Sequence, residues 1–108
     1  MNTRFITYYG IFDTSQTTLY TCPIRCQARV SNIGLEFASG SDVVGSVFLY
    51  VDRNNTTYTL LNARGVPIVF YEHDLILKPN DRIEILAGGT TPVIHGTITL
   101  EEKYINNG

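Results

Sequence analysis

The stretch Asp74–Ala87 restricts the fold of this chain more than any other segment does. A short apolar run, Leu75–Leu77, is followed by the turn sequence Lys78–Asp81, after which Ile83 and Ile85 alternate with charged residues. Proline presets φ near about −65° at one corner of a turn, and the asparagine after it tolerates the next corner. Alternation with a period of two places one face of a strand in the core and the other in water. The segment therefore predicts a β-hairpin.

The segment Gln27–Ala38 predicts a strand with an irregularity in its middle. Ala28 and Val30 share one face, whereas the apolar residues that begin at Ile33 follow the opposite parity. The phase slips by one residue near Ser31-Asn32. A slip of one residue within a strand is what a β-bulge produces, so we expect a bulge at this point.

Similar patterns recur along the rest of the chain, and no stretch shows a sustained helical period or a capped helix start. Further strands are expected over Thr3–Tyr9, Thr17–Thr21, Val43–Asp52, Thr56–Leu61, Val66–Tyr71 and Val93–Tyr104. Turns or loops are expected at Asp13–Gln16, Ser39–Asp42, Arg53–Asn55, Ala63–Gly65 and Gly88–Pro92. Eight or nine short strands at this spacing predict an all-β fold, a single-domain antiparallel β-sandwich of the jelly-roll kind.

The predicted domain has three parts. Residues Met1–Gln16 form a strand, or an arm that pairs with a neighbouring chain, and Thr17–Tyr104 form the sandwich. The last residues, Ile105–Gly108, are expected to fray. Val43–Asp52 is apolar on both faces, which predicts a central strand or one that faces a partner.

Composition excludes several classes of function. With 108 residues, 44% of them apolar and 17% charged, the chain suits one folded domain. Its net charge of −2 offers no basic surface for a nucleic-acid duplex. Lys78 and Lys103 are its only lysines, so it lacks a polybasic membrane anchor, and no segment is long and apolar enough to span a bilayer. The N-terminus does not resemble a signal peptide, so the protein acts where it is made or a signal has been removed.

The residues with reactive side chains do not form a recognisable motif. Cys22 and Cys26 are two small residues at a strand junction, with a local disulfide as the alternative, because a zinc site needs four ligands. His73 and His95 have no nucleophile motif beside them, and the carboxylates are scattered and mostly suit turns. Gly88-Gly89 lacks the lysine of a phosphate loop. We therefore expect no catalytic, cofactor-binding or metal-binding residues, although a small hydrolase using His73 or His95 stays an alternative.

Tyrosine is abundant for a chain of this length, with seven residues, and Tyr8, Tyr9, Tyr50, Tyr58 and Tyr71 are among those in predicted strands. Tyrosine suits binding surfaces because one end of its side chain is apolar and the other is polar. These side chains either pack the faces of a thin sandwich or form an interface. The candidate interface residues are Phe5, Tyr8, Tyr9, Phe48, Tyr50, Tyr58 and Tyr71.

Several turn and strand motifs resemble those of short bacteriophage virion proteins. The motifs are Leu19-Tyr20-Thr21-Cys22-Pro23, Ala28-Arg29-Val30, Gly40-Ser41-Asp42-Val43, Leu49-Tyr50-Val51-Asp52, the run Leu75–Ile85 and Val93–Ile98. The resemblance covers about Leu19 to Leu100. The chain differs in carrying Asn80 where glycine is usual in that group, and in the arm before Thr17.

The resemblance implies a non-enzymatic structural role in a phage particle, made in the host cytoplasm and located in the virion. Its partners would be copies of itself, with a trimer as one candidate state, and the major capsid protein or other virion proteins. A head decoration or cement protein is the leading interpretation, and a neck or tail accessory protein is the next. A carbohydrate-binding or adhesin module is a separate alternative, with Tyr58, Tyr71 and His73 as its aromatic platform.

Overall fold

The computed structural model of the protein describes residues 3–13, 15, 17–37, 43–64, 68–89 and 93–105. These residues form nine strands and one short 3₁₀ helix. In chain order they are β1 (Thr3–Phe12), β2 (Thr17–Thr21), β3 (Cys26–Phe37), β4 (Val44–Val51), η1 (Asp52–Asn54), β5 (Thr56–Arg64), β6 (Ile68–Tyr71), β7 (Leu75–Leu77), β8 (Arg82–Gly88) and β9 (Ile94–Tyr104). All the predicted strands within this part of the chain are therefore present.

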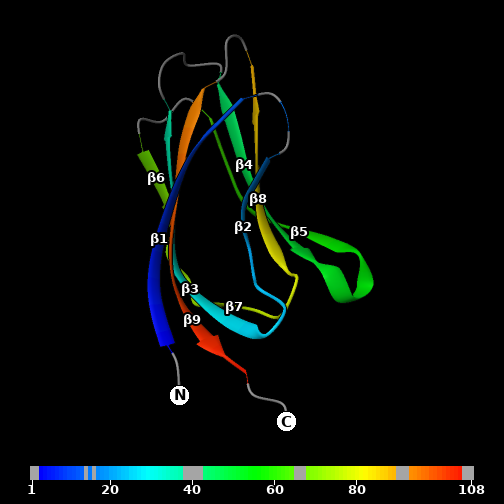
Figure 1. The fold of residues 1–108 in the computed structure, drawn as a ribbon. Helices are drawn as coiled ribbons and strands as arrows, with labels where there is room; N and C mark the ends of the chain where they lie inside the picture. Colours follow the sequence, from blue (N-terminus) through cyan, green and yellow to red (C-terminus); the bar gives the residue numbers. More distant parts are fainter. Residues whose placement is uncertain are drawn as a thin grey trace.

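The strands pack as two antiparallel sheets (Figure 1). Sheet A has five strands in the order β1-β9-β3-β6, with β7 also paired to β3, and sheet B has four in the order β2-β8-β4-β5. The chain crosses repeatedly between the sheets, and β6 and β7 together occupy one edge of sheet A. This strand order is that of a jelly roll. The predicted all-β sandwich is confirmed.

The predicted hairpin between Leu75 and Ile85 is wrong. β7 pairs with β3 in sheet A, whereas β8 lies between β2 and β4 in sheet B. The turn itself is present, and Asn80 adopts a φ of 72°, in the left-handed region that glycine favours. The alternation correctly identified two strands joined by a turn. It did not identify their partners, because alternation records which face of a strand is buried and not which strand lies beside it.

Backbone contacts to a distant segment hold this turn in place. The Cys22 N–H donates to the Asp81 carbonyl oxygen at 2.8 Å, and the Asn80 N–H donates to the Cys22 carbonyl oxygen at 2.9 Å. The buried Asp81 carboxylate accepts the N–H groups of Lys78 at 3.0 Å and Asp52 at 3.1 Å. One carboxylate thus joins the end of β4 to the corner between the sheets, where its oxygens satisfy N–H groups near strand ends.

The predicted bulge in β3 is confirmed. The register of β3 against β9 shifts between Val30 and Asn32, so Ser31 is the extra residue. On either side of it Val30 and Ile33 are both fully buried, as the change of parity required. β7 pairs with β3 before the bulge and β6 pairs with it after the bulge.

Strands β4 and β5 form a hairpin whose tip projects away from the sandwich (Figure 1). The connection is η1 followed by Asn55, which has a φ of 53°. The hairpin predicted at Arg53–Asn55 is confirmed, and β4 is central in sheet B as its two apolar faces predicted. The loop predicted from Ala63 is wrong in part, because Ala63 and Arg64 continue β5 and pair with the start of β4.

Strand β1 is an edge strand of sheet A. All ten of its residues pair with β9 of the same chain, from Thr3 opposite Lys103 to Phe12 opposite Ile94. Phe12 is only 3% exposed and belongs to the core. Its ring occupies the space that a Cβ would need at Gly10 and Gly96, where such an atom would lie 2.8 Å and 2.9 Å from ring carbons. Two glycines opposite each other thus create the site for this ring.

Some predictions fall outside the described residues. They are the turn at Ser39–Asp42, the region around Gly65–Pro67, the end of the turn at Thr90–Pro92 and most of the C-terminal segment after Ile105.

Candidate functional site

Exposed apolar side chains gather on the outer face of sheet A, the face turned away from sheet B. Residues of odd number on β1 point outward, as do the residues that pair with them across the sheet. The exposed apolar members of this face are Phe5, Tyr9, Ile11, Ile68, Phe70 and Ile76. Their exposed fractions run from 46% at Ile76 to 80% at Phe5. Several large apolar side chains in water on one face indicate an interaction surface.

The centre of this outer face is polar. Thr97, Thr99 and His95 point outward from β9, and Asn32 and Glu36 lie opposite Thr99 and His95 on β3. The apolar side chains therefore form two rims, one on β1 and one on β6 and β7, with a polar stripe between them. A partner that covers this face would bury the apolar side chains of both rims and meet the hydrogen-bonding groups of the stripe.

A shallow groove of about 170 Å³ crosses the outer face. Tyr9 stands on one side of the groove, and Ile68 and Phe70 stand on the other. Gly34 forms part of its base, and a Cβ there would lie 3.0 Å from both the Phe70 ring and the Thr97 hydroxyl. The missing side chain at Gly34 therefore lets Phe70 lie across the sheet and keeps the groove open.

Polar groups also line this groove. The Tyr9 hydroxyl and His95 Nδ1 are 2.7 Å apart and share a hydrogen bond, and the two rings meet edge to face. The Glu36 carboxylate lies 4.0 Å from the same nitrogen. Aromatic walls with hydroxyl, imidazole and carboxylate groups can hold a flat molecule that has polar edges. Phe70 and Ile68 were not among the predicted interface residues. The register places them opposite Gly34 and Glu36, and therefore on the outer face.

The predicted interface residues are divided among several surfaces. Phe5 and Tyr9 belong to the outer face of sheet A, whereas Tyr8 points toward sheet B, with its ring 5.6 Å from that of Tyr20. Tyr71 is half-buried and lies beside His73, with the ring centroids 5.0 Å apart. Tyr58 lies on β5, in the other sheet, and is exposed. The platform of Tyr58, Tyr71 and His73 therefore draws on both sheets.

Phe48 and Tyr50 point outward from sheet B, where Tyr50 is engaged within the chain. The Arg82 guanidinium lies 3.7 Å from the centre of the Tyr50 ring, and the Tyr50 hydroxyl donates a hydrogen bond to Asn55. Arg82 Nε is 2.5 Å from the Glu84 carboxylate, and this contact raises the pKa of Arg82. These contacts hold the tyrosine ring flat against its own sheet.

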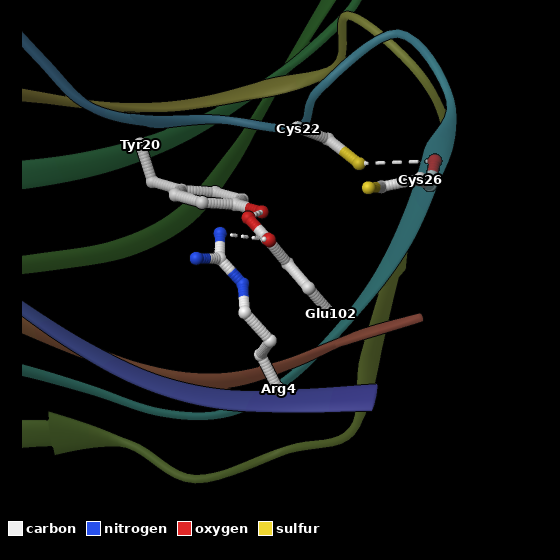
Figure 2. A network of polar contacts seen from close by, with 5 residues as sticks. All are labelled: Arg4, Tyr20, Cys22, Cys26 and Glu102. Carbon is white, nitrogen blue, oxygen red and sulfur yellow. Dashed lines mark hydrogen bonds and ion pairs between the residues drawn. The ribbon is translucent and has the colours of Figure 1, made fainter. Parts of the chain in front are cut away.

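A polar network that is buried at Tyr20 and Glu102 and open to water at Arg4 lies near the start of β1 (Figure 2). The Glu102 carboxylate, 3% exposed, accepts the Tyr20 hydroxyl at 2.5 Å and the Arg4 guanidinium at 2.8 Å. Burial, and then the hydrogen bond to Glu102, raise the pKa of Tyr20, so the phenol stays a proton donor. The sequence contains the signal for this site, because Glu102 has the same parity as Ile98 and Leu100.

The two cysteines lie beside this network as free thiols (Figure 2). The buried Cys22 thiol is 3.3 Å from the Cys26 carbonyl oxygen, to which it donates. Burial raises the pKa of Cys22 to about 12, so the thiol remains protonated at neutral pH. A protonated, fully buried thiol is a poor nucleophile. Cys22 is therefore a packing residue beside the network, in which Arg4 and Tyr20 tie β1 and β2 to Glu102 of β9.

The described residues contain neither a candidate metal site nor a helix that could span a membrane. No three histidine, cysteine or carboxylate side chains in this part of the chain lie together as a metal site would require. No helix within it has the length and apolar character needed to cross a bilayer.

Comparisons with known sequences do not assign the chain to a family. No protein-family model matches the chain. An alignment 90 residues long relates the chain, at 34% identity, to the glutamate–tRNA ligase of Dechloromonas aromatica (strain RCB). This match covers 76% of the chain and 18% of that protein, so the chain spans less than a fifth of the length of this curated relative.

Comparisons with solved structures identify the fold. The acid-stable capsid of Helicobacter pylori bacteriophage KHP30 contains a chain that aligns with a TM-score of 0.66 and 14% identity, over 94% of this chain and 87% of that one. A disulfide-linked pilus protein of Bacillus endospore appendages aligns with a TM-score of 0.53 and 13% identity, over 97% and 88%. A chain of infectious bursal disease virus, Gx strain, aligns at 0.52 and 10%, over 100% and 35%.

At these identities the likeness is one of fold. The protein has the β-sandwich architecture found in viral capsid and bacterial appendage chains. Two of the three matches extend over most of both chains, so the similarity concerns the whole sandwich and is not confined to a few strands.

Proposed function

We propose that this protein is a non-enzymatic structural component of a bacteriophage virion, of the capsid decoration or cement type. The observation that carries the proposal is the set of exposed apolar side chains on the outer face of sheet A. The similarity of the protein's fold to that of a phage capsid chain supports the same role. Burying two apolar rims against neighbouring subunits would stabilise a particle through many copies of one modest contact.

The partners in this proposal are other copies of the chain and the major capsid protein or other virion proteins. A twofold contact between copies uses the same surface on both of them, so a single apolar face is sufficient to form it. A neck or tail accessory protein would use the same physical contact at a different place in the virion. The buried, protonated Cys22 and Tyr20 support a structural role, because neither group is prepared for acid–base or nucleophilic chemistry.

The test compares two isoleucines of similar exposure. Ile11 on the outer face is 64% exposed, and Ile24, in the turn between Cys22 and Cys26, is 71% exposed. Native mass spectrometry across a concentration series should find oligomers of the wild type and of Ile24→Ser. Ile11→Ser should dissociate at concentrations at least about tenfold higher, since it removes about 1 to 2 kcal/mol of apolar burial at each contact.

Equal dissociation of both variants would contradict the role of the outer face. A wild type that remains monomeric at every concentration would contradict self-association. Thermal unfolding of each variant serves as the control for folding, and both should retain the wild-type Tm within a few degrees because both side chains are in water.

The groove beside Tyr9 favours a second candidate function, that of a carbohydrate-binding module. Aromatic rings can stack on a sugar while the His95 and Glu36 side chains hydrogen-bond its hydroxyls. A glycan array probed with the wild type and Tyr9→Ala tests this function. Absence of binding by the wild type would remove it.

A further inference from the structure

We infer that the free edge of β1 pairs antiparallel with β1 of a second copy, so that sheet A continues across a twofold axis. This inference rests on the proposed function and specifies the contact that self-association uses. β1 stands at the end of its sheet, and among the described residues only β9 pairs with it. An edge strand leaves a row of N–H and C=O groups available to another strand.

The other edges of the sandwich carry features that discourage such pairing, and β1 does not. β2 has five residues and a register shift between Thr18 and Tyr20, and β5 has a shift opposite Val47 and Phe48. The far edge of sheet A is divided between β6, with four residues, and β7, with three. Short strands and bulges are the usual protections of an edge.

β1, in contrast, is long and regular. Its ten residues, Thr3–Phe12, pair with β9 without a register shift, and the strand contains no proline and no lysine. Its single charged side chain, Arg4, is bound to Glu102 of its own chain. The edge is therefore suited to accept another strand along almost its whole length.

The sequence of β1 is complementary to itself in one register. A twofold axis at Thr7 would place Phe5 of each copy opposite Tyr9 of the other on the outer face. It would also place Ile6 opposite Tyr8 on the inner side. Aromatic pairs directly across an antiparallel ladder are among the favourable cross-strand pairs. The two aromatic rims would then join into one apolar strip.

This register also separates the charges. Arg4 of one copy would lie opposite Gly10 of the other, and the two guanidinium-bearing residues would be roughly 20 Å apart along the ladder. An axis at Tyr8 would instead place Arg4 opposite Phe12 and separate Phe5 from Tyr9. The side chains thus favour the axis at Thr7.

Cysteine cross-linking tests the register in the full-length chain. In a Cys26→Ser background, which removes the half-buried native thiol, Thr7→Cys, Tyr8→Cys and Thr57→Cys are each oxidised with glutathione disulfide. Each cross-link converts two thiols into one disulfide and reduces one glutathione disulfide to two glutathiones. Thr7→Cys should give most of the covalent dimer, because residues at the axis have Cβ atoms about 5 Å apart. Thr57→Cys, on the exposed side of β5, is the matched control and should remain monomeric.

A charge at the axis provides the second measurement. Thr7→Lys should raise the dimer dissociation constant about tenfold, because two ammonium groups would face each other across the axis. Thr59→Lys, exposed on β5, should leave it unchanged. The dissociation constants are measured by sedimentation velocity, and thermal unfolding confirms that each variant is folded.

The outcomes separate this inference from the proposed function. If the protein self-associates and Ile11→Ser weakens it, but Thr7→Cys cross-links no better than Thr57→Cys, pairing through β1 is overturned and the proposed function stands. Preferential cross-linking of Tyr8→Cys would overturn the register. A protein that is monomeric throughout would overturn both.

Discussion

Single residues in this protein mostly have structural tasks, and the buried polar ones show this best. Tyr20 and Arg4 both bind the Glu102 carboxylate, so a charge that would be costly between the sheets has two partners. Among the described residues, no buried side-chain nitrogen or oxygen lacks a hydrogen-bond partner. Cys22 completes this region as a neutral thiol whose proton is held by the folded state.

The raised pKa of Cys22 predicts a loss of stability at high pH. The folded pKa is about 12 against an ordinary value of 9.0, so the unfolded chain loses this proton first and unfolding becomes more favourable as the pH rises from about 9. Between pH 8 and pH 11 the wild type should lose about 3 kcal/mol of unfolding free energy relative to Cys22→Ala.

Urea unfolding of both proteins across this pH range measures the difference. The free energy of unfolding of the wild type should fall toward that of Cys22→Ala and then below it. A difference between the two proteins that stays constant up to pH 11 would show that the folded state does not retain the proton.

Among the elements, the turn between β7 and β8 is one of the connections that carry the chain from one sheet to the other. Asp81 joins three segments there through its backbone and side chain. Both of its carboxylate oxygens accept backbone N–H groups, one from Lys78 and one from Asp52. The corner thus depends on the side chain at position 81 having two oxygen atoms that accept hydrogen bonds.

Replacing Asp81 by asparagine should destabilise the protein by about 2 kcal/mol. Asparagine has one oxygen acceptor, so its NH₂ group would face an N–H donor that has lost its partner. The matched control is Asp74→Asn, which removes an exposed ion pair with Arg29 and should cost less than about 0.5 kcal/mol. Chemical denaturation measures both, and equal costs for the two variants would contradict this account of the corner.

For the molecule taken together, one strand has a part in folding and, in the proposal above, a part in assembly. β1 inserts Phe12 into the core and presents Phe5 to water on its other face. Substitution of each by alanine separates the two contributions, because the same ring is removed from the same strand.

Phe12→Ala should lower the free energy of unfolding by about 3 kcal/mol. The substitution would leave a cavity where the ring now covers Gly10 and Gly96. Phe5→Ala should change that free energy by less than about 0.5 kcal/mol and should weaken self-association. Calorimetry measures the first quantity and native mass spectrometry the second. If Phe5→Ala unfolds as readily as Phe12→Ala, the two faces of β1 do not have separate functions.

The strands, the bulge at Ser31 and the parity of the core could all be predicted from the order of the residues. These features are local, because alternation records which side of a strand is buried wherever that strand lies. The same parity placed Phe5 and Tyr9 together on one face.

Which strands pair and which edge stays open could not be predicted in this way and is known from the folded chain. Pairing depends on contacts between residues far apart in sequence, such as β3 with β9, and alternation carries no information about the partner. For this reason the hairpin expected at Leu75–Ile85 became a crossing between sheets. The assembly of Phe70 and Tyr9 into one groove, and the exposure of β1 as a regular edge, come from the same long-range order.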